Sequence, residues 1–231
     1  MFEKLKQEVF EANLLLPKYG LITFTWGNVS QISEDRKYVA IKPSGVEYDT
    51  MTVDDIVVLT LDGEVVEGTL KPSSDTPTHL ELYREFTDIN AIVHTHSKWA
   101  TTIAQAKYDV KALGTTHADY FYGDIPCTEQ LSNEQIQGDY ELETGRIIVE
   151  TFKQRGIEPK NMPAVLVGSH GPFTWGKNAK KAVENSVVLE EVSHMAYMNY
   201  LLKGAELDSM KPELLDKHFL RKHGANSYYG Q

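Results

Sequence analysis

The sequence predicts an α/β protein with a central sheet that is mixed or antiparallel. Short apolar runs alternate with segments of helical periodicity along the 231 residues, as expected of an α/β fold. Asp62-Gly63 stands between two apolar runs and is a strong hairpin signal, which argues against a purely parallel sheet. Hydrophobic residues make up 41% of the chain, enough for a buried core, and the length suits a single domain spanning 1–231.

The first part of the chain predicts one helix followed by short strands. Apolar residues recur every three or four positions over residues 2–16, and Pro17 is expected to end that helix. Residues 23–30 form a turn-like break in a β-rich region, and a strand is predicted at 38–41. A turn at 43–45 precedes the hairpin, whose strands are expected at 56–61 and 64–66.

The rest of the chain alternates between helices and strands. Thr76 followed by Pro77 resembles an N-cap with proline at the first helical position. Apolar runs predict buried strands at 91–93 and 164–167, with 172–175 returning beside the second. Further helices are expected over 97–107, 146–155, 178–202 and 212–223, and glycine follows the last three closely.

Charge and composition exclude several classes of function. The chain has 23 basic and 33 acidic residues, a formal net charge of −10, so we expect no nucleic-acid partner. No apolar run approaches the roughly 18 residues that span a bilayer, and the N-terminus lacks a secretory core, so no membrane partner is expected. Cys127 is the only cysteine, which excludes an internal disulfide and fits the cytoplasm. Dinucleotide-binding and P-loop glycine motifs are absent from the sequence.

Three of the eight histidines suggest a metal site. His94 and His96 end a predicted strand, where alternate residues share a face roughly 7 Å apart, so both rings can reach one ion. His170 follows the second apolar strand and would join them if the two strands are neighbours. Three histidines with an open position are typical of catalytic rather than structural zinc, and Asp75 could add a carboxylate ligand. The alternative is that these are ordinary hydrogen-bonded histidines, which is our interpretation of His79, His194 and His223.

Six motifs and the C-terminal sequence resemble the zinc-dependent class II aldolase/epimerase family over essentially the whole chain. The motifs are Thr-Trp-Gly-Asn-Val-Ser (25–30), Lys-Pro-Ser-Gly-Val (42–46), Pro-Ser-Ser-Asp-Thr-Pro-Thr-His (72–79), His-Thr-His (94–96), Gly-Thr-Thr-His-Ala-Asp-Tyr (114–120), Ser-His-Gly-Pro-Phe (169–173) and the ending Arg-Lys-His-Gly-Ala-Asn-Ser-Tyr-Tyr-Gly-Gln (221–231). The resemblance implies a three-layer α/β/α sandwich around a mainly antiparallel sheet. It also implies a homotetramer with active sites between subunits and one Zn²⁺ per subunit.

The resemblance also implies roles for individual residues. Zinc ligands match His94, His96 and His170, with Asp75 at the matching acidic position. The acid/base pair matches Asp119 and Tyr229 of an adjacent subunit, and His218 matches a further active-site histidine. Sugar-phosphate contacts match Gly27, Asn28, Ser44, Gly45, Ser73 and Ser74. From the residues alone, turn formation is the favoured interpretation of both serine motifs, and Lys42 either adds positive charge there or is solvated.

The implied activity is inversion at carbon 4 of a ketopentose phosphate. It interconverts L-ribulose 5-phosphate and D-xylulose 5-phosphate through cleavage and re-formation of the bond between carbons 3 and 4. This reaction occurs in the breakdown of both arabinose and ascorbate. An aldolase of the same family, of the fuculose-phosphate type, is the first alternative, and a non-catalytic metal-binding module is the second. A zinc hydrolase is disfavoured because the sequence has no H-E-x-x-H motif.

Overall fold

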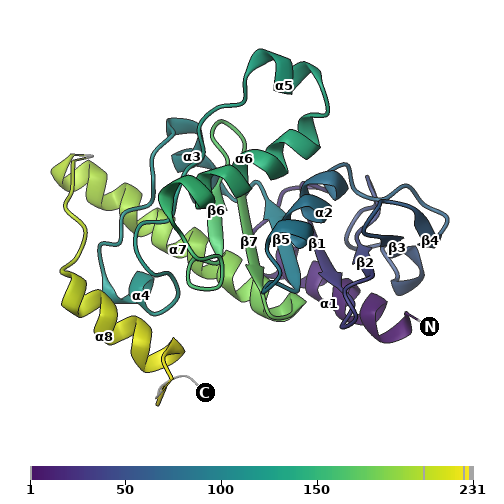
Figure 1. Ribbon diagram of the computed structural model, residues 1–231, viewed down its shortest axis with the longest axis horizontal. Coiled ribbons are helices and arrows are strands. Elements are labelled where there is room, and N and C mark those ends of the chain that lie inside the picture. Colours follow the sequence, from purple (N-terminus) through teal and green to yellow (C-terminus); the bar gives the residue numbers. More distant parts are fainter. Residues whose placement is uncertain (1, 205, 226, 229–231) are drawn as a thin grey trace.

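The computed structural model describes residues 2–204, 206–225 and 227–228. Its centre is a seven-stranded sheet in the order β4-β3-β2-β1-β5-β7-β6, and each neighbouring pair is antiparallel (Figure 1). The strands are β1 (Gly27–Ile32), β2 (Tyr38–Ile41), β3 (Val57–Thr60), β4 (Val65–Glu67), β5 (Ala91–Thr95), β6 (Ala164–Leu166) and β7 (Pro172–Gly176).

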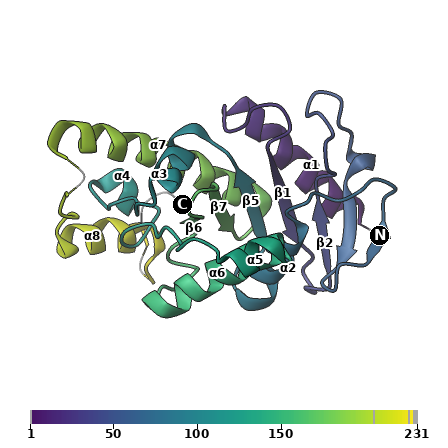
Figure 2. The same cartoon turned by 90° about the horizontal axis from the view of Figure 1, so that it is seen from above.

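Helices cover both faces of this sheet. They are α1 (Glu3–Lys18), α2 (Thr76–Glu85), α3 (Lys98–Ala106), α4 (Thr115–Ala118), α5 (Asn133–Gln137), α6 (Tyr140–Arg155), α7 (Ala179–Lys203) and α8 (Pro212–His223), with a 3₁₀ turn at Val53–Asp55. Figure 2 shows α1 and α7 on one side of the sheet and α2 and α6 on the other. The predicted α/β/α sandwich is therefore confirmed. Within the described residues, no helix has the length and apolar character needed to cross a membrane.

The side-chain alternation of β5 decides which residues face which helical layer. Ala91 and Val93 pack in a cluster with Val9 of α1, whereas Ile92 packs in a cluster with Leu80 of α2. Residues two apart on a strand point to the same face. By this period His94 lies on the same face of β5 as Ile92, so its side chain points towards the α2 layer.

Most predicted elements occur close to their expected positions. The hairpin is confirmed, since β3 pairs with β4 and Gly63 adopts a positive φ of 88° between them. The predicted end of the first helix at Pro17 is wrong by one residue, because α1 continues to Lys18. Proline has a φ compatible with helix, so in the last turn it removes one hydrogen bond without reversing the chain.

Several local predictions differ from the structure. Helix α6 begins at Tyr140 rather than at 146, and α4 and α5 had no predicted counterpart. Thr76 is the first residue of α2, and Asp75 occupies the N-cap. The early start of α6 depends on packing against α2, where a Cβ on Gly145 would lie 2.8 Å from the Cβ of Glu81. Such a long-range contact leaves no periodic pattern in the sequence.

Candidate active site and metal centre

Three imidazoles converge at one edge of the sheet. His94, His96 and His170 each offer a nitrogen, and these three atoms lie within 4.8 Å of one another. The ring centroids are 5.0 Å apart for His94 and His96, 4.8 Å for His94 and His170, and 5.1 Å for His96 and His170. No other group of three or more potential metal-binding side chains was found in the described part of the chain.

The topology that gathers these rings differs from the expected one. His94 lies in β5, and His96 follows directly after its end. The expectation required the two apolar strands, β5 and β6, to be neighbours, but β7 lies between them. His170 reaches the cluster because it lies in the tight turn between β6 and β7, where its N–H donates to the carbonyl of Val167. β7 pairs directly with β5, so this turn opens beside His94.

The ring of His94 is held on two sides. Its Nδ1 lies 3.0 Å from the carbonyl oxygen of Pro172, and its ring stacks on Phe173 with centroids 4.2 Å apart. A carbonyl can only accept a hydrogen bond, so Nδ1 must carry a proton, and Nε2 is the nitrogen that faces His96. His94 is buried, His170 is partly buried and His96 is exposed. The cluster thus has one solvent-facing side.

The three rings fit a divalent metal ion. The Nε2 atoms of His94 and His96 are 3.1 Å apart, close to the roughly 3.3 Å expected between two nitrogens of tetrahedral zinc. Burial, together with His94 and His96, lowers the pKa of His170 to about 3. The pKa of His96 is also lowered, by partial desolvation of its ring within the cluster and by the neighbouring His94. These two rings are therefore neutral near pH 7, as metal coordination requires.

Asp75 lies beside the cluster. Its carboxylate does not cap α2 but accepts a 2.7 Å hydrogen bond from Nδ2 of Asn28. Burial tends to raise the pKa of Asp75, but His94, His79 and the Asn28 hydrogen bond together lower it. The group is therefore ionised at neutral pH. Asp75 lines the same cavity as the three histidines without belonging to their group of mutually close atoms, so its place as a direct ligand stays a prediction.

The residues expected to contact a sugar phosphate surround one cavity with the histidines. This cavity has a volume of about 640 Å³. All seven predicted contact residues line it: Gly27, Asn28, Lys42, Ser44, Gly45, Ser73 and Ser74. Two of the contributing loops are joined by backbone hydrogen bonds, from Ser44 N to Lys71 O at 2.9 Å and from Ser73 N to Lys42 O at 3.0 Å. The sequence therefore places hydroxyls and backbone amides, which suit a phosphate, next to the imidazoles.

Lys42 is buried rather than solvated, so the second interpretation from the sequence is wrong. Only 1% of the residue is exposed. Its Nζ donates to the carbonyl oxygens of Val46 at 2.6 Å and Pro43 at 3.2 Å, and thereby braces the loop that carries Ser44 and Gly45. Burial lowers the pKa of Lys42 to about 8. The loop thus holds a positive charge at neutral pH that is lost in mildly alkaline solution.

At two positions in this cavity the backbone adopts a positive φ that favours glycine. Gly27 has a φ of 139°, and a Cβ there would lie 2.9 Å from the carbonyl oxygen of His94. A side chain at position 27 would therefore force β1 away from the strand that carries the metal-site histidine. Gly45 has a φ of 70° in the turn after Ser44, a conformation that glycine adopts without steric cost.

Sequence reasoning missed three residues around the site. Tyr140 and Glu141 line the cavity from the start of α6, and the Tyr140 hydroxyl lies 3.3 Å from Nδ1 of His170. The Gly138-Asp139 break before the apolar run was the available signal. His79, interpreted as an ordinary helix-face residue, is fully buried, and its Nδ1 shares a 2.7 Å hydrogen bond with Ser30 Oγ. Burial lowers the pKa of His79 to about 3.

Asp119 and His218 do not lie in the histidine cavity of their own chain. Asp119 is the C-cap of α4, and its carboxylate accepts hydrogen bonds from His218 Nδ1 at 3.1 Å and from the Arg221 guanidinium at 3.0 Å. Neither Asp119 nor His218 lines the cavity. Helices α4 and α8 lie at one end of the molecule, beyond the β6 edge of the sheet (Figure 1). Tyr229 lies outside the described residues.

A three-layer sandwich in which three imidazoles converge beside a cavity lined with hydroxyls and backbone amides is an arrangement of the class II aldolase type. Residues 7–197 match the family described as Class II Aldolase and Adducin N-terminal domain. The chain belongs to this family, which confirms the resemblance inferred from the motifs.

Two relatives and one solved structure show which members of the family this chain is similar to. The chain is 57% identical over 229 residues to the L-ribulose-5-phosphate 4-epimerase UlaF of Salmonella paratyphi B, covering 99% of both proteins. It is also 57% identical over 229 residues to the L-ribulose-5-phosphate 4-epimerase UlaF of Salmonella paratyphi C, again covering 99% of both proteins. Among solved structures, an L-fuculose 1-phosphate aldolase superposes with a TM-score of 0.78 at 25% identity, over 93% of this chain and 94% of that one.

Proposed function

We propose that this protein is an isomerase that interconverts L-ribulose 5-phosphate and D-xylulose 5-phosphate. The observation that carries the proposal is that three imidazoles able to hold a metal ion line the same cavity as two loops rich in hydroxyls and backbone amides. Relatives with 57% identity over 99% of the chain, named L-ribulose-5-phosphate 4-epimerase, support epimerisation as the reaction.

The reaction explains why such a cavity is needed. The hydrogen on carbon 4 is not next to the ketone at carbon 2, so it is not acidic enough for simple removal. Breaking the bond between carbons 3 and 4 gives a three-carbon enediolate and glycolaldehyde phosphate, and the aldehyde can rotate before the bond re-forms. The loops around Ser44 and Ser73 would hold the phosphate during this rotation, with the charge of Lys42 behind them.

The metal is proposed to be Zn²⁺, one per subunit, held by His94, His96 and His170, with Asp75 as a further carboxylate. When bound, zinc would supply Lewis-acid stabilisation of the negative charge that develops on the carbonyl fragment. The chain supports this use because the cluster has nitrogen donors and no thiolate, the donor set of catalytic zinc sites. Asp75 adds a fixed negative charge that favours a cation there.

Proton transfer at the carbon 4 hydroxyl is assigned to Asp119 and Tyr229 of a neighbouring subunit, with His218 beside Asp119. Each face of the rotating aldehyde requires its own acid/base group, so two are needed. The position of Asp119 outside the cavity of its own chain supports a contribution to another subunit. We therefore propose a homotetramer with shared sites. A cytoplasmic location fits the single reduced cysteine.

Purified protein with bound zinc is expected to convert L-ribulose 5-phosphate to D-xylulose 5-phosphate with little free aldehyde. Removal of the metal by a chelator should lower turnover by about a thousandfold, because the developing charge then lacks its stabilising cation. Metal analysis and a coupled assay on the same samples would measure both. Undiminished turnover by metal-free protein would contradict the proposal.

An aldolase is the second candidate because of the similarity to L-fuculose 1-phosphate aldolase. The same assay separates the two. An aldolase releases its fragments, so net accumulation of free aldehyde would support it and would count against the epimerase.

Replacing Lys42 with methionine is expected to raise KM for the phosphorylated substrate by about tenfold or more at pH 7, because one charge-assisted interaction is lost. The pKa of Lys42 near 8 adds a pH dependence. The charge is present below this pH and lost above it, so the wild-type KM should rise between pH 7 and 9. Lys42→Arg keeps its charge in this range. A KM that still rises in Lys42→Arg would assign the effect to another group.

A further inference from the structure

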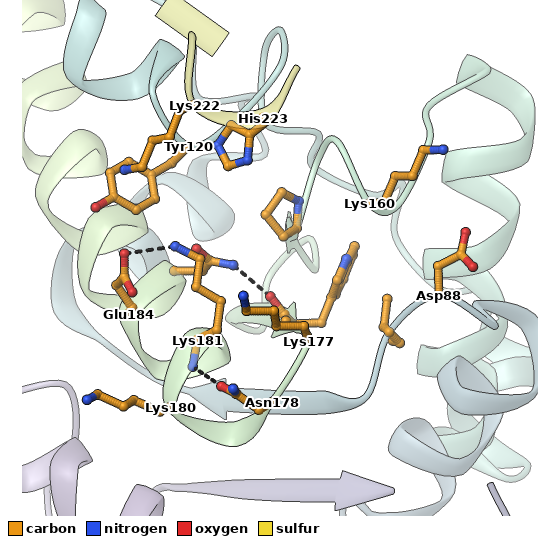
Figure 3. Close-up of a pocket in the computed structure, with 15 residues that line it drawn as sticks. Asp88, Tyr120, Lys160, Lys177, Asn178, Lys180, Lys181, Glu184, Lys222 and His223 are labelled. Carbon is orange, nitrogen blue, oxygen red and sulfur yellow. Dashed lines mark hydrogen bonds and ion pairs between the residues drawn. The ribbon is translucent and has the colours of Figure 1, made fainter. Parts of the chain in front are cut away.

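A second cavity, separate from the histidine cavity, lies between the start of α7 and the end of α8. It has a volume of about 900 Å³, within the range of small-molecule sites, and it shares no lining residue with the histidine cavity. Figure 3 shows Lys222 and Tyr120 on one side of it, Lys160 and Asp88 on the other, and Lys177 between them.

This second cavity is strongly cationic in a protein whose net charge is −10. Its lining includes five lysines and two acidic residues, Asp88 and Glu184. Lys181 pairs with Glu184 at 2.8 Å. Within the described ranges, Lys160, Lys177, Lys180 and Lys222 have no carboxylate within ion-pair distance. A ligand that carries negative charge would balance this excess.

Two of the cations are held close together on one aromatic ring. Lys222 Nζ lies 3.5 Å from the centroid of the Tyr120 ring, and Lys181 Nζ lies 4.8 Å from it. Burial and the proximity of Lys181 lower the pKa of Lys222, although Glu184 and Asp119 act in the opposite direction. Glu184 pairs with Lys181, so Lys222 is the charge at this ring that a ligand could still pair with.

A buried amide braces the wall of the second cavity. Asn185 is 2% exposed and lines the cavity. Its Nδ2 donates to the carbonyl oxygen of Trp175 at 2.8 Å, which ties the start of α7 to β7. Its Oδ1 is shielded from solvent, so the lysines are the groups of this cavity that can meet a ligand.

We propose that this second cavity binds a small organic bisphosphate. The lysines would contact its two phosphates. The first turn of α7 adds to the positive potential of the cavity, since the positive end of the helix dipole lies at Asn178 on the cavity wall. This site is distinct from the one proposed to hold the substrate.

Isothermal titration of the metal-loaded protein with glucose 1,6-bisphosphate and with pyrophosphate tests the proposal. We expect saturable binding of both, because each carries two phosphate groups that the lysines can contact. Lys180→Gln with Lys222→Gln should weaken both by about tenfold or more. Lys4→Gln with Lys18→Gln makes the same charge change on exposed residues of α1 and should leave binding unaltered.

Three outcomes would overturn the proposal. The first is no saturable binding of either probe. The second is an equal loss in the α1 control, which would show a general charge effect. The third is binding that survives Lys180→Gln with Lys222→Gln but is lost in Lys42→Met, which would place the anion in the histidine cavity. Unchanged melting temperatures would establish that each variant is folded.

Discussion

Replacing His94 with alanine is expected to remove the bound metal and to lower turnover by about a thousandfold or more. His94 is the ligand that the fold fixes most firmly, through its hydrogen bond to Pro172 and its stacking on Phe173. Without it, two imidazoles remain, which is too few for a stable catalytic zinc site. Metal content by atomic spectroscopy and turnover of L-ribulose 5-phosphate would measure the two losses together.

Two further variants make the His94 result interpretable. His94 is buried, so its removal also leaves a void, whereas His96 is exposed and His96→Ala should lose metal with little loss of stability. His194, which stacks on Trp99 outside the cavity, is a matched control that should retain metal and activity. Full metal occupancy and near-native turnover in both His94→Ala and His96→Ala would remove the basis of the proposed function.

Asp119→Asn is expected to retain the metal but to lose turnover by a factor of about 10² to 10⁴, the usual contribution of a general acid/base group. If Asp119 serves a neighbouring subunit, a mixture of Asp119→Asn and His94→Ala subunits should recover part of the activity. Some sites in such mixed tetramers would combine an intact metal cluster with an intact carboxylate. The measurement is turnover after the two proteins are unfolded, mixed and refolded together.

A structural role for Asp119 must be separated from a chemical one, because it binds Arg221 and His218. Asp216→Asn is a suitable comparison, since Asp216 also lies on α8 and accepts a 2.6 Å hydrogen bond from Tyr122. It should preserve turnover. If Asp216→Asn loses as much activity as Asp119→Asn, or if mixing recovers nothing, the shared acid/base site is wrong.

Local signals in the sequence were sufficient to predict that His94 and His96 lie side by side, but not the strand order that brings His170 to them. His94 and His96 share a strand face by the two-residue period alone, and the strand itself follows from an apolar run. The hairpin at Asp62-Gly63 is equally local, because the turn fixes the pairing of its strands. The residues of these segments therefore determine their local structure largely without contacts to distant parts of the chain.

Features that depend on distant contacts were not predictable in the same way. The insertion of β7 between β5 and β6 is a property of strand order, which no single segment encodes. The burial of Lys42 depends on carbonyl groups that only the folded loop directs towards its ammonium. The early start of α6, which brings Tyr140 to His170, depends on packing against α2.

The partner of His94 Nδ1 is a main-chain carbonyl, whereas the partner of His170 Nδ1 is the hydroxyl of Tyr140. No side-chain substitution can delete a peptide oxygen, so sequence drift at position 172 leaves the protonation pattern of the first ring intact. A single substitution at Tyr140 can alter the second ring. A substitution at position 140 can therefore change the hydrogen bonding of His170 while that of His94 stays constant. Position 140 is thus a place where evolution can adjust the reactivity of the site.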